Sequence, residues 1–323
     1  MTAQTMTALT VTGLSKTFPV SGGLLGRARP GVRAVRPVSF AVEPGETLGI
    51  VGESGCGKST LARMLVGLLP PSGGSIEIAG KALDTADPAA FGRRIQYVFQ
   101  DPISSLNPRK TIRQIMEAPL KLLHGMDRAA RAARIAEIFA SVNLREEFLD
   151  RYPHEFSGGQ AQRIGIARAL AAAPGIIILD EPVSALDVSV QAQVLNLLAG
   201  LKRDFGLTYL FISHDLAVVE AVSDRVMVLY FGAVVEIGRA AEIFTSPKHP
   251  YTRLLAESAP VVGRALAAPE QKDSELPDPL DPPRGCAFAG RCIRASAVCR
   301  ETDPPLEKMG DTRFAACHHP LED

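Results

Sequence analysis

The chain has 323 residues, of which 46% are hydrophobic and 22% are charged, so its composition is that of a folded protein with a sizeable core. The charges of its 35 basic and 35 acidic residues cancel. The chain therefore has no net positive charge to attract nucleic acid or anionic lipid. No stretch approaches the ~20 apolar residues that a membrane crossing needs, and residues 1–16 lack the pattern of a secretory signal.

The N-terminal part of the chain is predicted to be rich in strands. Segments 38–42 and 75–78 alternate apolar and polar residues, as half-buried strands do. Before the first of these strand candidates lies a glycine-rich stretch, 21–36, that carries four arginines: Arg27, Arg29, Arg33 and Arg36. Because glycine and proline are interleaved with these arginines, we interpret the stretch as a solvated loop and assign it no function.

A glycine-rich segment follows the apolar strand candidate 47–51 and precedes a helical pattern at 61–69. It comprises Gly52, Glu53, Ser54, Gly55, Cys56, Gly57, Lys58, Ser59 and Thr60. Strand, loop and helix in this order are the context that a phosphate-binding loop requires, because loop amides and the helix start attract an anion. We expect Lys58 to contact the β- and γ-phosphates and Ser59 to hold Mg²⁺. The alternative is an incidental glycine-rich turn, and Cys56 is interpreted as a small filler of that turn.

A second segment suggests the other half of a phosphate site. The apolar run 176–179 ends in Asp180 and Glu181. At the end of a buried strand, Asp180 is placed to support Mg²⁺ and Glu181 to polarise an attacking water. Two carboxylates at a strand end are by themselves more often a solvated terminus, but together with Lys58 they favour nucleotide hydrolysis.

The order of the predicted elements indicates an α/β fold. The apolar runs 176–179 and 209–212 are typical of strands buried on both faces of a parallel sheet, and the helical pattern 190–201 separates them. Helical periodicity prevails between about 101 and 173, which predicts an inserted helical subdomain. The proline-rich segment 276–283 predicts a linker. We therefore expect one domain over 1–257 and a linker with a small cysteine-containing module over 258–323.

Phe156, Ser157, Gly158, Gly159 and Gln160 resemble the signature motif that defines the ABC ATPase family, and the resemblance extends over residues 9–243. It implies an ABC-type P-loop ATPase core with an N-terminal antiparallel β region, the inserted helical subdomain and a small C-terminal extension. In the family, the signature contacts the γ-phosphate of an ATP that is held by the phosphate loop of the other subunit. Small residues at a helix start would present amides and a hydroxyl to that anion.

Further positions match the family's motifs in the expected order. Gln100, after the strand candidate 95–99, resembles the residue that senses Mg²⁺ and water. Segment 184–187, ending in Asp187, resembles the loop that crosses the dimer interface, and His214 resembles the switch that contacts the γ-phosphate. Phe18 lies where the family places a ring that stacks on adenine.

The resemblance therefore implies three groups of site residues. Catalytic roles are implied for Lys58, Gln100, Glu181 and His214. Magnesium ligation is implied for Ser59, Gln100 and Asp180. Contacts to ATP are implied for Phe18, residues 52–60, Gln100, Asp180, residues 157–160 and Asp187. The cofactors that follow are ATP and Mg²⁺.

Two segments, 100–109 and 247–255, resemble the subfamily that serves oligopeptide, dipeptide and related importers, including nickel and glutathione systems. The resemblance implies ATP hydrolysis coupled to import of a peptide or a related small solute. It also implies three kinds of partner: two integral membrane permease subunits, a second related ATP-binding subunit in a heterodimer, and an external substrate-binding protein. The expected location is the cytoplasmic face of the cell membrane.

Four cysteines fall in the last forty residues: Cys286, Cys292, Cys299 and Cys317. In a reducing compartment, cysteines grouped in a module with little core more often bind metal than form disulfides. Zinc, an iron-sulfur cluster and free structural thiols are the alternatives that the spacing leaves open. His318 and His319, beside Cys317, are either substitute ligands or exposed residues of the tail. The subfamily resemblance implies a 4Fe-4S cluster.

Two other function classes compete with a transporter subunit. A soluble ABC ATPase acting on nucleic acid or ribosomes commonly has two cassettes or a coiled-coil insertion, and neither occurs in this sequence. A binding module without catalysis is disfavoured because Lys58, Asp180, Glu181 and His214 are all present.

Overall fold

The computed structural model describes residues 7–20, 29–83, 87–258 and 276–322. Arg27 and residues 259–275, which precede the predicted linker 276–283, lie outside these residues. Within the described ranges, no helix is both long and apolar enough to cross a bilayer.

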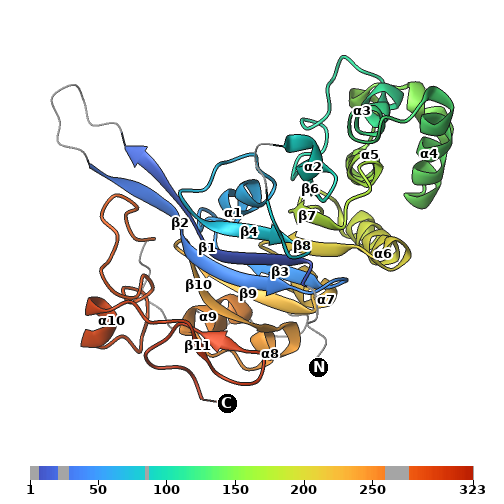
Figure 1. Cartoon of the computed structure of the whole chain (residues 1–323). Helices are drawn as coiled ribbons and strands as arrows, with labels where there is room; N and C mark the ends of the chain where they lie inside the picture. The colour runs from blue at the N-terminus through green and yellow to red at the C-terminus, as the bar shows by residue number, and fades with distance from the viewer. Residues whose placement is uncertain (1–6, 21–28, 84–86, 259–275, 323) are drawn as a thin grey trace, which may run out of the picture.

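Two sheets form the body of the molecule (Figure 1). The first is antiparallel with the order β2-β1-β4-β5, and its strands are β1 (Leu9–Val20), β2 (Arg29–Val42), β4 (Gly73–Ile78) and β5 (Lys81–Ala82). The second has the order β11-β12-β10-β9-β3-β8-β7-β6. Its strands are β3 (Thr47–Val51), β6 (Ile95–Val98), β7 (Ile176–Asp180), β8 (Thr208–Ile212), β9 (Arg225–Tyr230), β10 (Ala233–Arg239), β11 (Glu307–Lys308) and β12 (Phe314–Ala315).

Helices surround the second sheet and build a separate layer at one end of it. They are α1 (Lys58–Leu65), α2 (Pro88–Gly92), α3 (Ile112–His124), α4 (Arg128–Ser141), α5 (Gly158–Ala171), α6 (Val188–Phe205), α7 (Leu216–Val222), α8 (Ala240–Thr245), α9 (Pro250–Ser258) and α10 (Ala297–Glu301). Two 3₁₀ helices, Glu146–Asp150 and Pro153–Glu155, lie between α4 and α5.

The central strands β9, β3, β8, β7 and β6 are parallel and buried, as the continuous apolar runs predict. Their side chains alternate between two cores. In β7, Ile176 and Ile178 face the core that also contains α1 and the first sheet. Ile177 and Leu179 face the core that continues into the helical region. The sheet therefore separates the two cores and fixes the elements attached to its edges.

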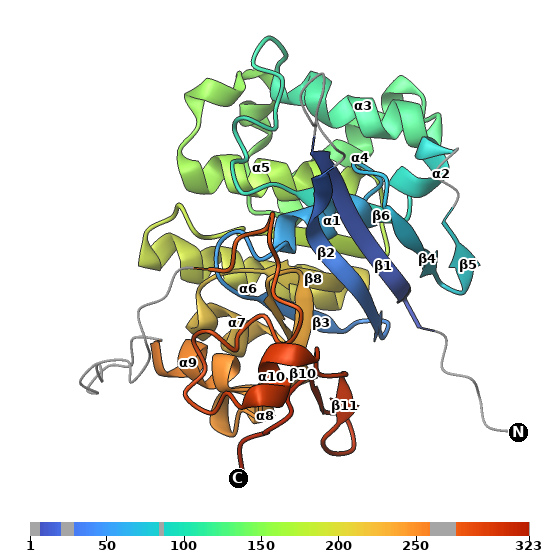
Figure 2. The same ribbon diagram turned by 90° about the vertical axis from the view of Figure 1, so that its left-hand side faces the viewer.

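The inserted helical region is confirmed. Helices α3, α4 and α5 pack on one another between residues 112 and 171. Both ribbon views place this region at the opposite end of the molecule from the C-terminal segment, drawn in red (Figures 1 and 2). The sequence prediction of an α/β core with an antiparallel N-terminal sheet also agrees with the observed architecture.

The prediction of a loop around the basic stretch is wrong for Arg29, Arg33 and Arg36. All three lie in β2, which pairs with β1, with Arg29 opposite Val20 and Arg33 opposite Thr17. Backbone hydrogen bonds to β1 and an ion pair from Arg36 to Asp303 outweigh the loop preference of the neighbouring glycines.

The C-terminal segment joins the second sheet. Strand β12 pairs with β10, with Glu236 opposite Ala315 and Ile237 opposite Phe314, and β11 continues the same sheet. Arg313 also forms a buried ion pair with Glu236 at 2.6 Å. Backbone pairing and this ion pair together attach the segment to the body of the molecule.

Candidate functional site

Four sequence motifs meet at one edge of the second sheet. Strands β3, β8, β7 and β6 are adjacent and parallel, so their carboxyl ends reach the same edge. The loop 52–60 follows β3, His214 follows β8, Asp180 ends β7 with Glu181 after it, and Gln100 follows β6. In open parallel sheets, this edge is where ligands bind.

Glu181 lies between two other predicted catalytic residues. Gln100 donates a hydrogen bond from Nε2 to Glu181 Oε2 at 2.8 Å, and His214 Nδ1 lies 3.1 Å from Oε1. The backbone of Glu181 is left-handed, with φ of 48°, and its amide donates to the carbonyl oxygen of Ile212 at 2.8 Å. A non-glycine residue in this conformation is strained by about 1–3 kcal/mol, and such strain concentrates at functional sites.

The loop 52–60 wraps back on itself as a phosphate cradle does. Gly57 has φ of 106°, and a Cβ atom there would lie 2.4 Å from the carbonyl oxygen of Ala34, so only glycine fits. Helix α1 begins at the next residue, three residues before its predicted start, and directs its free amides at the loop.

Lys58 is the cation of this loop, and its side chain is buried. Its ammonium donates to the carbonyl oxygens of Gly52 at 2.6 Å and Glu53 at 3.0 Å. No carboxylate among the described residues forms an ion pair with it, so its charge is available for an anion. The residues of this loop fit a bound phosphate chain.

Asp180 is buried and accepts a hydrogen bond from the Tyr97 hydroxyl. Burial and the neighbouring Asp180 raise the pKa of Tyr97 far above its usual range, so its hydroxyl remains a donor. Tyr97 has no recognisable signal in the sequence, because a tyrosine in a buried strand resembles any other aromatic residue of the core. Asp180 and the exposed Ser59 are hard oxygen ligands of the type that Mg²⁺ prefers.

The signature motif and Asp187 lie at helix starts away from these contacts. Ser157 caps α5 in a capping box with Gln160, at 3.4 and 3.1 Å. Asp187 caps α6, and hydrogen bonds from Ser189 and Val190 lower its pKa. In the part of the chain that is described, no hydrogen bond or ion pair joins residues 157–160 to the loop 52–60. Ser157 is exposed, so its surface is open to another molecule.

Phe18 is not joined to the phosphate loop by any described hydrogen bond. It lies in β1 opposite Val32, is 38% exposed, and its ring lies 5.3 Å from the Lys16 ammonium. Ala34 follows Val32 by two residues in β2. Its carbonyl oxygen lies so close to Gly57 that an added Cβ atom there would be 2.4 Å from it. The ring is thus on the hairpin that borders the loop.

The four C-terminal cysteines line one small cavity, and His249, His318 and His319 line it too. None forms a disulfide, and burial raises the pKa of Cys286 to about 11. Within the described ranges, however, no group of three or more His, Cys, Asp or Glu side chains is arranged to hold a metal ion. The thiols share a cavity without converging on a common metal position.

The fold and the site define a P-loop nucleotide-binding domain with an inserted helical layer. The family model for "ABC transporter" matches residues 35–184, and that for "Oligopeptide/dipeptide transporter, C-terminal region" matches residues 235–299. The chain is 46% identical to the oligopeptide transport ATP-binding protein AppF of Bacillus subtilis, covering 97% of both chains. It is 47% identical to the dipeptide transport ATP-binding protein DppF of Haemophilus influenzae, covering 96% of both.

A solved structure is also similar. It is a dimeric, post-hydrolysis state of the ATP-binding cassette MJ0796 with ADP and Pi, at 30% identity and a TM-score of 0.64, covering 72% of this chain and 98% of that one. The chain belongs to the ABC transporter family of ATP-hydrolysing subunits.

Proposed function

We propose that this chain powers the import of peptides, or of a related small solute, by hydrolysing ATP at the sheet edge described above. The observation that carries the proposal is the position of Glu181, whose carboxylate contacts Gln100 and His214 beside a phosphate loop. The substrate class is taken from the relatives, which are named for oligopeptide and dipeptide transport.

Each site residue then has a defined task. Lys58 and the amides of residues 52–60 bind the β- and γ-phosphates, and Glu181 accepts a hydrogen bond from the attacking water. Gln100 and His214 hold the Glu181 carboxylate in place through its two oxygens. Mg²⁺, held by Ser59, Asp180 and Gln100, would neutralise charge on the phosphates when bound. Catalysis is thus mainly positioning and charge neutralisation.

The site is completed by a second cassette. Ser157 is exposed at the start of α5 and has no described contact with this chain's own phosphate loop. A helix start of this kind binds anions, and the similar cassette MJ0796 is dimeric. We propose that two cassettes pair head to tail, with a related ATP-binding subunit as the partner of this chain, and that Phe18 and Asp187 contribute nucleotide and interface contacts.

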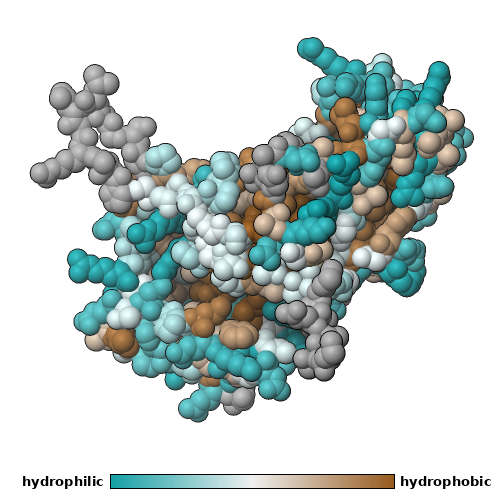
Figure 3. Space-filling view, viewed as in Figure 1, coloured by the Kyte–Doolittle hydropathy of each residue, from teal (hydrophilic) through white to brown (hydrophobic). Residues whose placement is uncertain are grey.

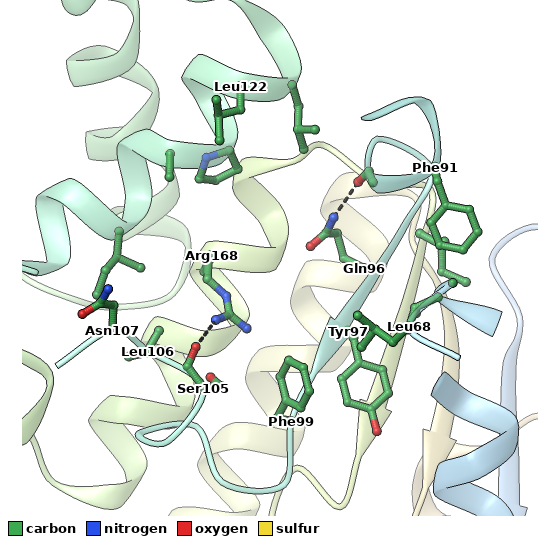
Figure 4. Close-up of a pocket in the computed structure, with 18 of the residues that line it drawn as sticks. Leu68, Phe91, Gln96, Tyr97, Phe99, Ser105, Leu106, Asn107, Leu122 and Arg168 are labelled. Carbon is green, nitrogen blue, oxygen red and sulfur yellow. Dashed lines mark hydrogen bonds between the residues drawn. The ribbon is translucent and has the colours of Figure 1, made fainter. Parts of the chain in front are cut away.

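A groove next to the site suits a membrane subunit. A cavity of about 640 Å³ lies between the sheet and the helical region, lined by Phe91, Phe99, Leu106 and Ile115 among others (Figure 4). Leu68 and Leu122 on its lining are 61% and 76% exposed. Hydrophobic residues gather in the hollow between the helical region and the body (Figure 3). Such a groove fits an apolar helix face.

Residues that line the groove are adjacent in the sequence to a predicted catalytic residue. Phe99 and Leu106 line it, and Gln100 lies next to Phe99 while contacting Glu181. Arg168 also lines the groove and donates to the Ser105 carbonyl oxygen at 2.8 Å (Figure 4). We propose that permease subunits dock here, which places the chain at the cytoplasmic membrane face, and that an external binding protein delivers the solute to them.

The first experiment separates binding from hydrolysis. Glu181→Gln should retain binding of Mg-ATP and lose turnover by about 10²-fold or more, because the group that polarises water is removed. Hydrolysis at the wild-type rate would remove Glu181 from the mechanism. Failure of the wild-type chain to bind Mg-ATP would overturn the nucleotide site itself.

A second experiment tests docking. Leu122→Glu should abolish recovery of integral membrane subunits in a pull-down from solubilised membranes. Leu280→Glu, an exposed leucine that does not line the groove, is the matched control. Recovery with ribosomes instead of membrane subunits would favour the competing class of soluble ABC ATPases.

We also propose that residues 1–257 form the ATPase unit and 258–323 a module that holds a 4Fe-4S cluster at Cys286, Cys292, Cys299 and Cys317. The support is that the four thiols line one cavity; the arrangement does not by itself form a metal site. Anaerobically purified protein should contain iron and labile sulfide. Replacing the four cysteines by serine should remove both, whereas Cys56→Ser should not, and iron-free wild-type protein would refute the cluster.

A further inference from the structure

Glu53, the second residue of the phosphate loop, is held by residues that are distant in the chain. Its amide donates to the Tyr251 hydroxyl at 2.8 Å, and its Oε2 accepts from Arg291 Nη1 at 2.8 Å. Its carbonyl oxygen accepts from Lys58 at 3.0 Å. Tyr251 belongs to α9 and Arg291 to the C-terminal module, so both contacts come from outside the loop. The amide, the carbonyl oxygen and the carboxylate of Glu53 therefore each have a hydrogen-bonding partner.

Arg291 is itself fixed by an aromatic cluster. Its guanidinium lies 5.9 Å from the Tyr230 ring centre and 5.6 Å from that of Phe288. These rings and Tyr251 pack together at 4.5 to 5.4 Å, and all three are 0 to 1% exposed. The Arg291 and Glu53 side chains are 18% and 28% exposed. The pair is therefore less screened by water and salt than a surface ion pair is.

The charge of Glu53 matters because of where it lies. The loop that carries it binds phosphates, and a carboxylate on that loop repels them unless it is neutralised. Arg291 is the one cation that forms an ion pair with Glu53 among the described residues. Without Arg291, the loop would present an uncompensated negative charge close to an anionic ligand.

We infer that Arg291 is a positioning residue for nucleotide binding, through which the C-terminal module sets the affinity of the phosphate loop for ATP. The inference rests on the nucleotide site proposed above. It gives the C-terminal module a direct effect on the ATPase reaction, through one ion pair and without any contact between the module and ATP.

Other contacts hold the module in place, so this effect is separable from simple attachment. Arg313 pairs with the buried Glu236, Arg36 pairs with Asp303, and β12 pairs with β10. Removing the Arg291 charge leaves all three in place. A change in nucleotide affinity without detachment of the module is therefore the expected result.

The experiment compares Arg291→Gln with Arg300→Gln, the exposed arginine of α10 in the same module. We measure Mg-ATP binding to the full-length chain, and kcat and KM for ATP in the assembled transporter. Arg291→Gln should raise KM for ATP by about three- to tenfold and leave kcat little changed. This pattern is expected when an interaction is lost equally from the ground state and the transition state. Arg300→Gln should match wild type.

Two further variants distinguish charge neutralisation from packing. Glu53→Gln combined with Arg291→Gln should bind ATP more tightly than Arg291→Gln alone, because the unpaired carboxylate is gone. Arg291→Lys should restore part of the affinity. A wild-type KM for Arg291→Gln, or no recovery in the double variant, would overturn the inference. A wild-type chain that does not bind Mg-ATP would instead overturn the proposed nucleotide site.

Discussion

His214 Nδ1 lies 3.1 Å from Glu181 Oε1, although 33 residues separate the two in the chain. Both follow neighbouring parallel strands, β8 and β7, whose register places Asp180 opposite Ile212. The imidazole is 61% exposed and the carboxylate 17%, so His214 covers Glu181 from the solvent side. This pairing gives the proposed water-polarising carboxylate a fixed orientation.

His214→Ala should therefore lower kcat by about 10²-fold, within the range for a lost acid-base or positioning group, with little effect on nucleotide affinity. Single-turnover hydrolysis and equilibrium Mg-ATP binding measure the two effects separately. His154→Ala, an exposed histidine near the signature, is the control and should keep wild-type turnover. Equal turnover of His214→Ala and wild type would show that the contact is not used.

Ser157 and Thr111 allow a test in which stability and function separate. Each caps a helix in the same capping box, Ser157 with Gln160 and Thr111 with Gln114. Alanine at either position should lower the free energy of unfolding by about 1 kcal/mol. Only Ser157→Ala should also lose cooperative ATP hydrolysis, because only this serine is proposed to contact ATP. Denaturant unfolding and ATPase rates check both, and a comparable loss of activity in Thr111→Ala would contradict the role of the signature.

The buried pair of Glu236 and Arg313 predicts a large effect on stability. Glu236 is 0% exposed and accepts from Arg313 at 2.6 and 3.0 Å and from the amides of Lys248 and His249 at 2.8 and 2.9 Å. Arg313→Met leaves this carboxylate without its cation and should destabilise the chain by about 3–5 kcal/mol.

Urea denaturation measures this change. The matched control is Arg203→Ala, which breaks an ion pair whose side chains are 80% and 58% exposed. That variant should unfold at nearly the wild-type urea concentration. Similar midpoints for Arg313→Met and wild type would mean that the C-terminal segment is not held through this pair.

Cys56 should be unreactive in the native protein. Its side chain is 2% exposed, and burial raises the pKa of its thiol despite the nearby Lys58 ammonium. Because the thiolate is the reactive form, a raised pKa lowers the reaction rate at neutral pH, and the rate increases as pH rises. Mass spectrometry after N-ethylmaleimide treatment should find Cys56 unmodified at pH 7 and modified in urea. Rapid native modification at pH 7 would contradict the buried, protonated state.

The local motifs were accessible from the sequence because their chemistry is encoded in consecutive residues. The loop 52–60, the Asp180 and Glu181 pair and the Ser157 helix start each lie where the alternating strands and helices predicted them. The buried parallel strands were also predictable, because in a continuous apolar run such as 176–179 the side chains on both faces of the strand are hydrophobic. Arg29, Arg33 and Arg36 were misassigned because a strand partner, β1, cannot be inferred from glycine content.

The chemical groups of the protein and their order along the chain follow directly from the amino-acid sequence. The contacts of Gln100 and His214 with Glu181, of Tyr97 with Asp180 and of Arg291 with Glu53 arise only when the chain folds. The physical reason is that hydrophobic periodicity fixes local elements, whereas contacts across 33 to 238 residues depend on strand order and packing, which no local pattern encodes.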